Sequence, residues 1–343
     1  MLLPIQFCRN NRRLWYLLIN IFHLMKEIGI LWQKKKGCLV FLSLIALVLS
    51  CSIESNTSGD DLSQNPEETN DLPTFDFDCE EVIPVQRRDA ISFPLDPNVF
   101  SSENSDLEGT LEGDQTIVSS ITGVTYRYHV YLPPEYQLEP DRSFPVLYWL
   151  DAQFWFFPNS LQPVKVIDLD QLPVILVGIE EGPSGRRAID YTFPGIAAYN
   201  RFFTEEFIPE VESDYRILGE ERTLQGVSAS GLASLVMMLS DEADPPIFKN
   251  HLSFDPYIQS ALNLENLLIE RLNVNAPLNK SLIITSMVGG FTPSVNPYAE
   301  GLAARNIPCL TLIESIYNGD HFGATNASIG NALRDVYKDY YED

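Results

Sequence analysis

The sequence has few histidines, and it has few basic residues beyond its first fifty positions. Only four histidines occur in 343 residues, so a mechanism that needs an imidazole has few candidates. From position 51 onward, 16 lysines and arginines stand against 46 aspartates and glutamates, a net charge of −30. A body this acidic repels nucleic acid and anionic lipid. We therefore expect no nucleic-acid partner.

The apolar run from Cys38 to Leu49 is shorter than the ~20 residues that a membrane-spanning helix needs. Three lysines precede the run, and Ser50 and Cys51 follow it. A basic segment, a short apolar segment and a small residue are typical of a secretory signal. The ending "VLSC" resembles a bacterial lipobox, which implies cleavage before Cys51, lipid on its sulfur and a place at the bacterial cell envelope. The alternatives are a signal anchor that stays attached and a cysteine that stands there by chance.

Composition divides the chain into three parts. We interpret residues 1–50 as a leader that carries the signal peptide, whose start is either Met1 or Met25. Residues 51–80 are polar, acidic and poor in aliphatic side chains, as expected for a disordered tether. Residues 81–343 are enough for one large domain. Cys79 and Cys309 are a single pair and only a weak indication of a disulfide.

The order of elements predicts an α/β fold. A hairpin is expected over 115–136, followed by alternating strands and helices. Expected strands cover 144–151, 172–180, 222–227, 250–256, 281–288 and 309–316, and expected helices cover 197–215, 229–240, 264–273, 298–306 and 326–341. This alternation predicts a mostly parallel sheet with helices on both faces. In such sheets the active-site residues come directly after the strands.

Ser228 lies in "TLQGVSASGLASL", between an expected strand and an expected helix. This is the setting of a nucleophile elbow, a turn so sharp that the residues beside the serine must be small. Gly226 and Ala229 satisfy that requirement, and Ser230 stands where a second glycine is usual. The alternative is a serine that only caps the helix.

The general base must be a histidine, and chain position selects one of the four. His23 lies in the leader, His129 lies in the hairpin, and His251 precedes a strand. His321 follows the last expected strand, in "NGDHFGATN". The order nucleophile, acid, histidine is that of an α/β-hydrolase. The alternative for His321 is an exposed surface residue.

The acid of a catalytic triad is harder to find. The segment after 281–288 has no carboxylate before Glu300, which is already in an expected helix. Asp255 ends the preceding strand, whereas Asp320 adjoins His321, and side chains of adjacent residues usually diverge. Either Asp255 orients His321 or the site is a Ser–His dyad. Asp255 could also be only a turn residue before Pro256.

The remaining site residues follow from the same arrangement. One oxyanion-hole N–H is expected from Ala229, and the second from Ala152 or Gln153 after the strand 144–151. Phe154 is expected at the mouth of the site, although core packing is an alternative for part of "FWFF". Tyr257 is a further candidate for substrate contact. Acyl transfer of this kind requires no metal and no organic cofactor.

Five segments together are more specific than any one of them. They are "YRYHVYLPPEY", "FPVLYWLDAQFWF", "RRAIDYTFP", "FFTEEFIPEVESDYRIL" and "GVSASGLASL". From about Val124 to the C-terminus, the chain resembles the esterase family that includes enterochelin esterases and related hydrolases. The resemblance implies an α/β-hydrolase fold without a large lid. It also implies Ser228 as nucleophile and His321 as base.

The chain departs from that family at three points. Family members commonly have "GxSxGG", "LDG" and an acid soon after the penultimate strand, whereas this chain has Ser230, Ala152 and no acid there. The resemblance also matches Arg187 to an arginine near the site, which implies contact with an anionic or polyhydroxy substrate. The alternative for Arg187 is an ion pair with Asp190.

Together these features predict a lipid-anchored serine esterase. Its expected partner is a small-molecule ester. It would contact a membrane only through the lipid anchor. Nothing in the sequence indicates an oligomeric state. A siderophore ester, an acylated sugar and a feruloyl-type ester all remain open as substrates. The alternatives are a weak or inactive hydrolase fold that binds a ligand at the cell surface, and a scaffold without a ligand.

Overall fold

The computed structural model describes Cys79 and residues 86–89, 92–102, 106–156, 160–258, 261–273 and 277–341. The chain divides into two units, Met1–Pro73 and Thr74–Asp343, and all described residues belong to the second. The predicted leader, Cys51 and nearly all of the predicted tether therefore lie outside the described residues. Within the described part, no helix combines the length and the apolar character needed to cross a bilayer.

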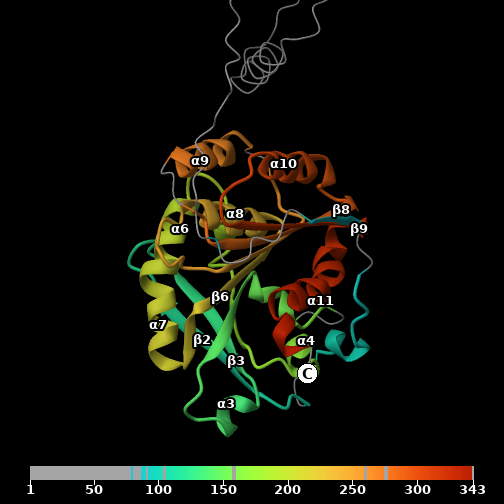
Figure 1. Cartoon of the computed structure of the whole chain (residues 1–343). Coiled ribbons are helices and arrows are strands. Elements are labelled where there is room, and N and C mark those ends of the chain that lie inside the picture. Colours follow the sequence, from blue (N-terminus) through green and yellow to red (C-terminus); the bar gives the residue numbers. More distant parts are fainter. Residues whose placement is uncertain are drawn as a thin grey trace, which may run out of the picture. The chain divides into compact units, whose positions relative to one another are not determined.

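One mixed sheet forms the centre of the second unit (Figure 1). Its nine described strands have the order β1-β9-β8-β7-β6-β4-β5-β3-β2. Neighbours from β1 through β5 in this order are parallel, while β3 is antiparallel to both β5 and β2. The strands are β1 Gln86–Asp89, β2 Thr110–Val118, β3 Thr125–Leu132, β4 Phe144–Leu150, β5 Ile175–Ile179, β6 Ile217–Val227, β7 Asn250–Phe254, β8 Lys280–Gly289 and β9 Leu310–Asp320.

The strand sequences explain this arrangement. Every residue of β4 and of β5 is buried, as expected for apolar strands covered on both faces. The β2–β3 hairpin turns through Gly123, whose φ of +69° favours glycine. The predicted fold class is confirmed: a mostly parallel sheet between helices, with an antiparallel hairpin before it.

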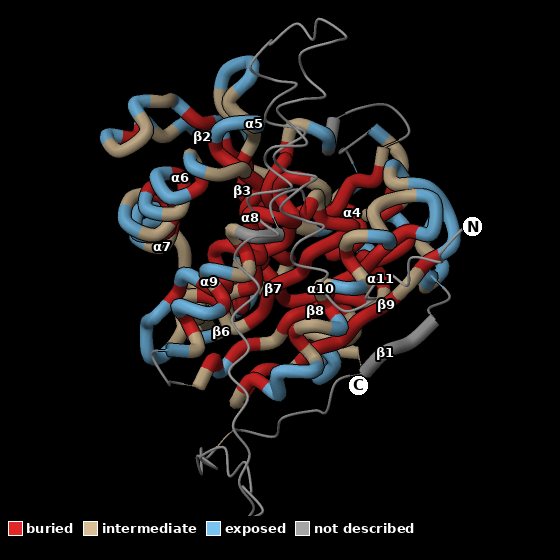
Figure 2. Tube along the Cα trace, turned by 90° about the horizontal axis from the view of Figure 1, so that it is seen from above, coloured by how far each residue is buried: buried red, intermediate tan, exposed pale blue. Residues whose placement is uncertain are grey.

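Helices cover both faces of the sheet and enclose two hydrophobic cores. Residues from α6, α7, α8, α9 and α10 pack into the larger core, and residues from α4 and α11 pack into the other. Figure 2 shows the buried residues concentrated along the strands and α8. The α-helices are α3 Glu135–Leu138, α4 Pro163–Leu169, α5 Arg186–Asp190, α6 Ile196–Phe202, α7 Ile208–Asp214, α8 Ala229–Ser240, α9 Ala261–Asn273, α10 Thr292–Ala304 and α11 Ala324–Val336.

Several elements differ from the sequence expectation. The helix expected over 197–215 is divided into α6, a π-helical turn over Phe203–Phe207 and α7, where Pro209 has no N–H to continue the α-helical bonding. Helix α10 starts at Thr292, six residues early, because Pro293 is tolerated in the first turn. Strand β1 was not expected, since "QRRD" has no apolar pattern.

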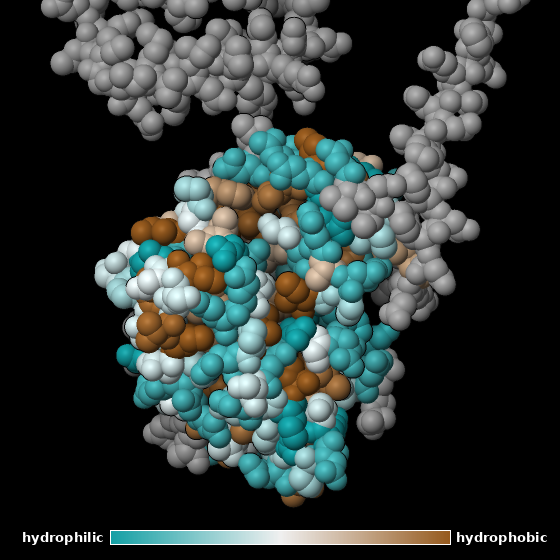
Figure 3. All heavy atoms as spheres, turned by 90° about the vertical axis from the view of Figure 1, so that its left-hand side faces the viewer, coloured by the Kyte–Doolittle hydropathy of each residue, from teal (hydrophilic) through white to brown (hydrophobic). Residues whose placement is uncertain are grey.

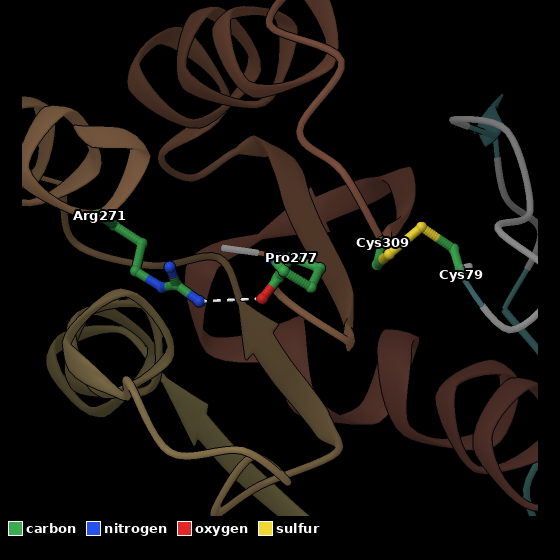
Figure 4. Close-up of a disulfide and its surroundings, with 4 residues drawn as sticks. All are labelled: Cys79, Arg271, Pro277 and Cys309. Carbon is green, nitrogen blue, oxygen red and sulfur yellow. Dashed lines mark hydrogen bonds between the residues drawn. A yellow bond between two sulfur atoms is a disulfide. The ribbon is translucent and has the colours of Figure 1, made fainter. Parts of the chain in front are cut away.

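Cys79 and Cys309 form a disulfide that closes 230 residues of chain, with Cα atoms 5.2 Å apart (Figure 4). Cys309 directly precedes β9, and β9 pairs with β1, which begins seven residues after Cys79. The weak sequence indication of a disulfide is therefore confirmed. On the face of the molecule that Figure 3 shows, hydrophobic residues form separate patches in a mostly hydrophilic surface.

Candidate active site

Ser228 occupies the sharp turn between β6 and α8. Its backbone has φ 60° and ψ −120°, a conformation that L-residues rarely adopt and that costs about 1–3 kcal/mol. Two hydrogen bonds fix the turn: Ser228 N donates to Phe254 O at 3.0 Å, and Tyr257 N donates to Ser228 O at 3.0 Å. The Ser228 side chain makes no capping bond to α8. The alternative in which Ser228 only caps the helix is therefore not supported.

Gly226 makes this turn possible. A Cβ atom at Gly226 would lie 2.1 Å from Ser230 O, a backbone atom that cannot yield. Helix α8 then enters the protein between sheet and outer helices, and its residues from Ala229 to Leu239 are all buried. A helix that is apolar all round belongs in such an interior position. The serine is therefore presented from a rigid strand–turn–helix unit.

Asp255 and His321 lie together, although they follow different strands. Asp255 comes directly after β7, and His321 comes directly after β9, two places further along the sheet. His321 Nδ1 lies 2.7 Å from Asp255 Oδ2. The Asp255 side chain is fully buried, whereas the His321 side chain is 23% exposed. This arrangement leaves the other ring nitrogen of His321, Nε2, free to act as a base.

The Asp255 carboxylate reaches His321 by crossing the end of β8. Its Oδ1 accepts hydrogen bonds from Met287 N and Phe291 N, both at 3.0 Å. A Cβ atom at Gly290 would lie 2.1 Å from Asp255 Oδ2, so the crossing requires glycine there. The segment after β8 thus supplies no acid of its own, and it holds the acid of the neighbouring strand with backbone N–H groups.

Aromatic rings line the histidine side of the site. The Phe291 ring centroid lies 4.5 Å from that of His321 and 5.2 Å from that of Tyr257. Phe322 follows His321, with 5.9 Å between the ring centroids, and is 93% exposed. Of these rings, only Tyr257 is predicted from the sequence; Phe291 and Phe322 are not. Adjacency to His321 was the one signal that pointed to Phe322.

The expected oxyanion donors lie at the same edge of the sheet. Ala229 begins α8, so its N–H is one of the first-turn groups that have no partner within the helix. Ala152 and Gln153 begin the 3₁₀ helix Ala152–Phe156 directly after Asp151. The Gln153 side chain is engaged, since its Nε2 donates to Asp151 Oδ1 at 3.0 Å and its Oε1 accepts from Glu181 N at 2.9 Å. The donors that this segment can supply to an oxyanion are therefore its backbone N–H groups.

A buried carboxylate joins the oxyanion segment to the serine turn. Asp151 is 2% exposed and has a φ of 63°. Ser230 Oγ lies 2.6 Å from Asp151 Oδ2, and the same Oγ accepts from Val227 N at 2.9 Å. From the sequence alone, Ser230 is only a small residue in the place of a glycine. The structure gives its hydroxyl a specific role in fixing β6 and α8 against β4.

Arg187 completes this network. Its Nε and Nη2 donate to the two oxygens of Asp151, each at 2.8 Å. Arg187 therefore lies beside the site in a structural ion pair, as the alternative predicted, but its partner is Asp151 rather than Asp190. Asp190 binds the neighbouring Arg186 instead, which leaves each arginine of "RRAID" with its own carboxylate. The contact of Arg187 with a substrate stays a prediction.

The other histidines of the domain are occupied elsewhere. His129 Nε2 lies 2.9 Å from Glu180 Oε1, and His251 is fully buried in β7.

Phe154 is 46% exposed in the segment after β4, in accord with a place at the mouth of the site rather than in the core. Within the described residues, no group of three or more His, Cys, Asp or Glu side chains could hold a metal ion.

Comparison with known proteins agrees with the geometry. A family model described as "Putative esterase" matches residues 119–308, more than half of the chain. The ferri-bacillibactin esterase BesA of Bacillus subtilis is 26% identical over 176 residues. That match covers 43% of this chain and 60% of the relative, so the chain matches less than two thirds of the curated relative's length.

Solved structures share the fold. The BES protein from Bacillus cereus superposes with a TM-score of 0.56 at 24% identity, over 66% of this chain and 94% of the other. The IroE-like serine hydrolase from Shewanella oneidensis has a TM-score of 0.56 at 22% identity, over 68% and 82%. With the family model matching from the β2–β3 turn to the segment before β9, the chain belongs to the putative esterase family.

Proposed function

We propose that this protein is a serine-dependent carboxylic ester hydrolase. The observation that carries the proposal is the 2.7 Å contact between His321 Nδ1 and Asp255 Oδ2, at the sheet edge where Ser228 occupies a strained turn. A buried carboxylate behind an imidazole fixes its tautomer and stabilises the imidazolium that forms during catalysis. The chain also belongs to a family of esterases.

The reaction proceeds in two stages. Ser228 Oγ attacks the ester carbonyl while His321 Nε2 takes its proton, and the N–H groups of Ala229 and of Ala152 or Gln153 stabilise the oxyanion. The protonated His321 then gives its proton to the leaving alcohol, which departs and leaves an acyl group on Ser228. Water, deprotonated by His321, releases the acid and restores the serine.

The substrate class is proposed from the relatives. The Bacillus subtilis relative is named as an esterase of ferri-bacillibactin, so we propose a siderophore-type or acylated-sugar ester for this chain. The alternative of an inactive binding protein depended on a missing acid. Asp255 supplies that acid from the preceding strand, which favours the enzyme.

We also propose that the protein is anchored at a bacterial cell envelope through lipid on Cys51. The basic and apolar segments before "LSC" support this, and so does the Cys79–Cys309 disulfide, because disulfides persist in oxidising compartments. Cys51→Ala should release the protein from membranes or block its processing. A Cys51→Ala protein that is processed and fractionates like the parent would contradict the anchor.

Ser228→Ala tests the catalytic proposal. In well-built serine sites this change costs roughly 10⁶ in turnover. Turnover of a simple aryl ester and labelling by a fluorophosphonate probe should both be lost. Ser240→Ala is the control, because Ser240 is the exposed last residue of the helix that begins after Ser228, and it should keep both. Ester hydrolysis by a folded Ser228→Ala protein would refute the mechanism.

A further inference from the structure

The site lies at a sheet edge where every nearby cation is already paired. The segments after β4, β5, β6, β7, β8 and β9 contain two basic residues, Arg186 and Arg187. Both bind buried carboxylates, those of Asp190 and Asp151. Arg127 lies at the same edge on β3, beyond β5, and pairs with Glu180 and Asp114 at 3.8 and 3.5 Å. The parts of these segments outside the described residues, 157–159 and 259–260, contain no Lys or Arg.

Carboxylates outnumber these cations at the edge. Glu181 follows β5 and Asp320 ends β9, and no ion pair of either is found among the described residues. The pKa of the Glu181 carboxyl is raised by burial and by the charge of Asp151, as expected where the local potential is negative. An anionic group that approaches Ser228 therefore meets net negative charge and finds no unpaired cation among the described residues of these segments.

The same edge exposes large hydrophobic side chains. Nine such side chains are exposed among the described residues, and four of these lie at or beyond the ends of β4, β5, β8 and β9 at this edge. They are Phe154 after β4, Ile189 after β5, Val288 at the end of β8 and Phe322 after β9, with exposed fractions of 46%, 49%, 59% and 93%. Of these four, Phe322 has its ring centroid 5.9 Å from that of His321, and an exposed apolar side chain beside a reactive group favours an apolar ligand. We call these four residues the apolar rim.

We propose that the site selects uncharged or cationic esters that carry an apolar or aromatic group, and that it disfavours polyanionic esters. This inference rests on the proposed function and narrows it. Among siderophore-type or sugar esters, it favours those whose acyl or alcohol part is neutral and apolar. The apolar rim would bind that part, and the unpaired carboxylates would repel negative charge.

Three aryl esters with one leaving group test the inference. They are the 4-nitrophenyl esters of acetic acid, of 3-phenylpropanoic acid and of 3-phenylpropanoic acid with a carboxylate on the ring. We expect kcat/KM to be about 10-fold higher for phenylpropanoate than for acetate. The carboxylated ester should be about 10-fold poorer than phenylpropanoate at low salt, and this gap should narrow as salt screens the repulsion.

Variants separate the contribution of the apolar rim from that of the carboxylates. Phe322→Ser should lower kcat/KM for phenylpropanoate by roughly 5- to 10-fold more than it lowers kcat/KM for acetate. Leu138→Ser is the matched control, since Leu138 is 77% exposed in α3, which follows the end of β3 at the opposite sheet edge, and it should change neither ester. Glu181→Gln should raise kcat/KM for the carboxylated ester relative to phenylpropanoate.

The outcomes distinguish failure of the inferred substrate preference from failure of the proposed esterase activity. Preference for the carboxylated ester, or an equal effect of Phe322→Ser on acetate and phenylpropanoate, would overturn the inference and leave the esterase proposal standing. A folded protein that hydrolyses none of the three esters and shows no fluorophosphonate labelling of Ser228 would overturn both.

Discussion

Asp255 contacts His321 across the end of the strand that separates their own two strands. The carboxylate follows β7 and the imidazole follows β9, yet Oδ2 and Nδ1 are 2.7 Å apart. Met287 N and Phe291 N, on either side of the end of β8, donate to the other oxygen. The acid is thus fixed by the strand that it crosses.

Asp255→Asn should lower turnover by ~10² or more, towards the ~10⁴ that follows replacement of a fully engaged triad aspartate. The amide can no longer stabilise an imidazolium or fix the productive tautomer. Turnover of an aryl ester, with circular dichroism to establish folding, measures the effect. Glu300→Gln and Asp320→Asn are the controls and should change turnover little. Full activity of folded Asp255→Asn would instead favour a Ser–His dyad.

Gly290→Ala should reduce turnover to a similar degree without altering a charge. The added Cβ would lie 2.1 Å from Asp255 Oδ2 and displace the carboxylate from His321. Gly301→Ala is the control, because its Cβ would approach only the flexible Arg305 side chain inside α10, and alanine favours a helix. If Gly290→Ala were as active as Gly301→Ala, the crossing of β8 by Asp255 would be wrong.

Asp151→Asn should lower kcat by about 10-fold or more while KM changes little. Asp151 holds the oxyanion segment, and a shift of about 1 Å in such donors can cost 10²-fold in rate. Asp190→Asn is the control, since it breaks the matching ion pair of Arg186 in the same helix and should lower the melting temperature without this loss of kcat. Equal kinetic effects of the two variants would assign Asp151 a purely structural role.

His251 should make the protein sensitive to mild acid. Burial first, and then the positive charge of Lys280, hold the pKa of His251 well below 6.5. Above pH 6.5 both folded and unfolded states carry a neutral ring, whereas below it the unfolded state binds a proton that the folded state does not. Stability is therefore lost as the pH falls from 6.5, by at most about 1.4 kcal/mol per pH unit.

Denaturant unfolding at several pH values checks this. Between pH 6.5 and 5, the free energy of unfolding should fall more steeply for the parent than for His251→Leu, which has no ring to protonate. The variant itself will be less stable at every pH, so the slopes are compared rather than the absolute values. Parallel slopes would mean that His251 accepts a proton in the folded state.

The sequence indicates the strand-end positions of the site well and the side-chain contacts poorly. Ser228 and His321 are recognisable because each follows a strand whose apolar run is clear. Asp255 could be proposed as the acid but not selected over a Ser–His dyad, since its reach across β8 depends on Gly290 and on two backbone N–H groups. The directions of these N–H groups are set by the folded loop, and no residue pattern specifies them.

The network around Asp151 was missed for a related reason. A serine at position 230 is compatible with a tight turn whether or not its hydroxyl has a partner. Its partner is set by the pairing of β4 with β6, which brings residues 79 positions apart into contact. Likewise, "RRAID" offers two arginines to one nearby aspartate, and only the tertiary structure decides which of them turns towards Asp151.

The Cys79–Cys309 disulfide determines how the domain would carry a mechanical load. Tension that arrives along the chain from residues before Cys79 passes through the sulfur–sulfur bond to the residue that precedes β9. The short β1 strand lies inside the covalent loop and is therefore shielded from the pull. Without the bond, the same tension would reach β1 first and act on its pairing with β9. His321 follows the other end of β9, so the load enters this strand at the end remote from the catalytic base.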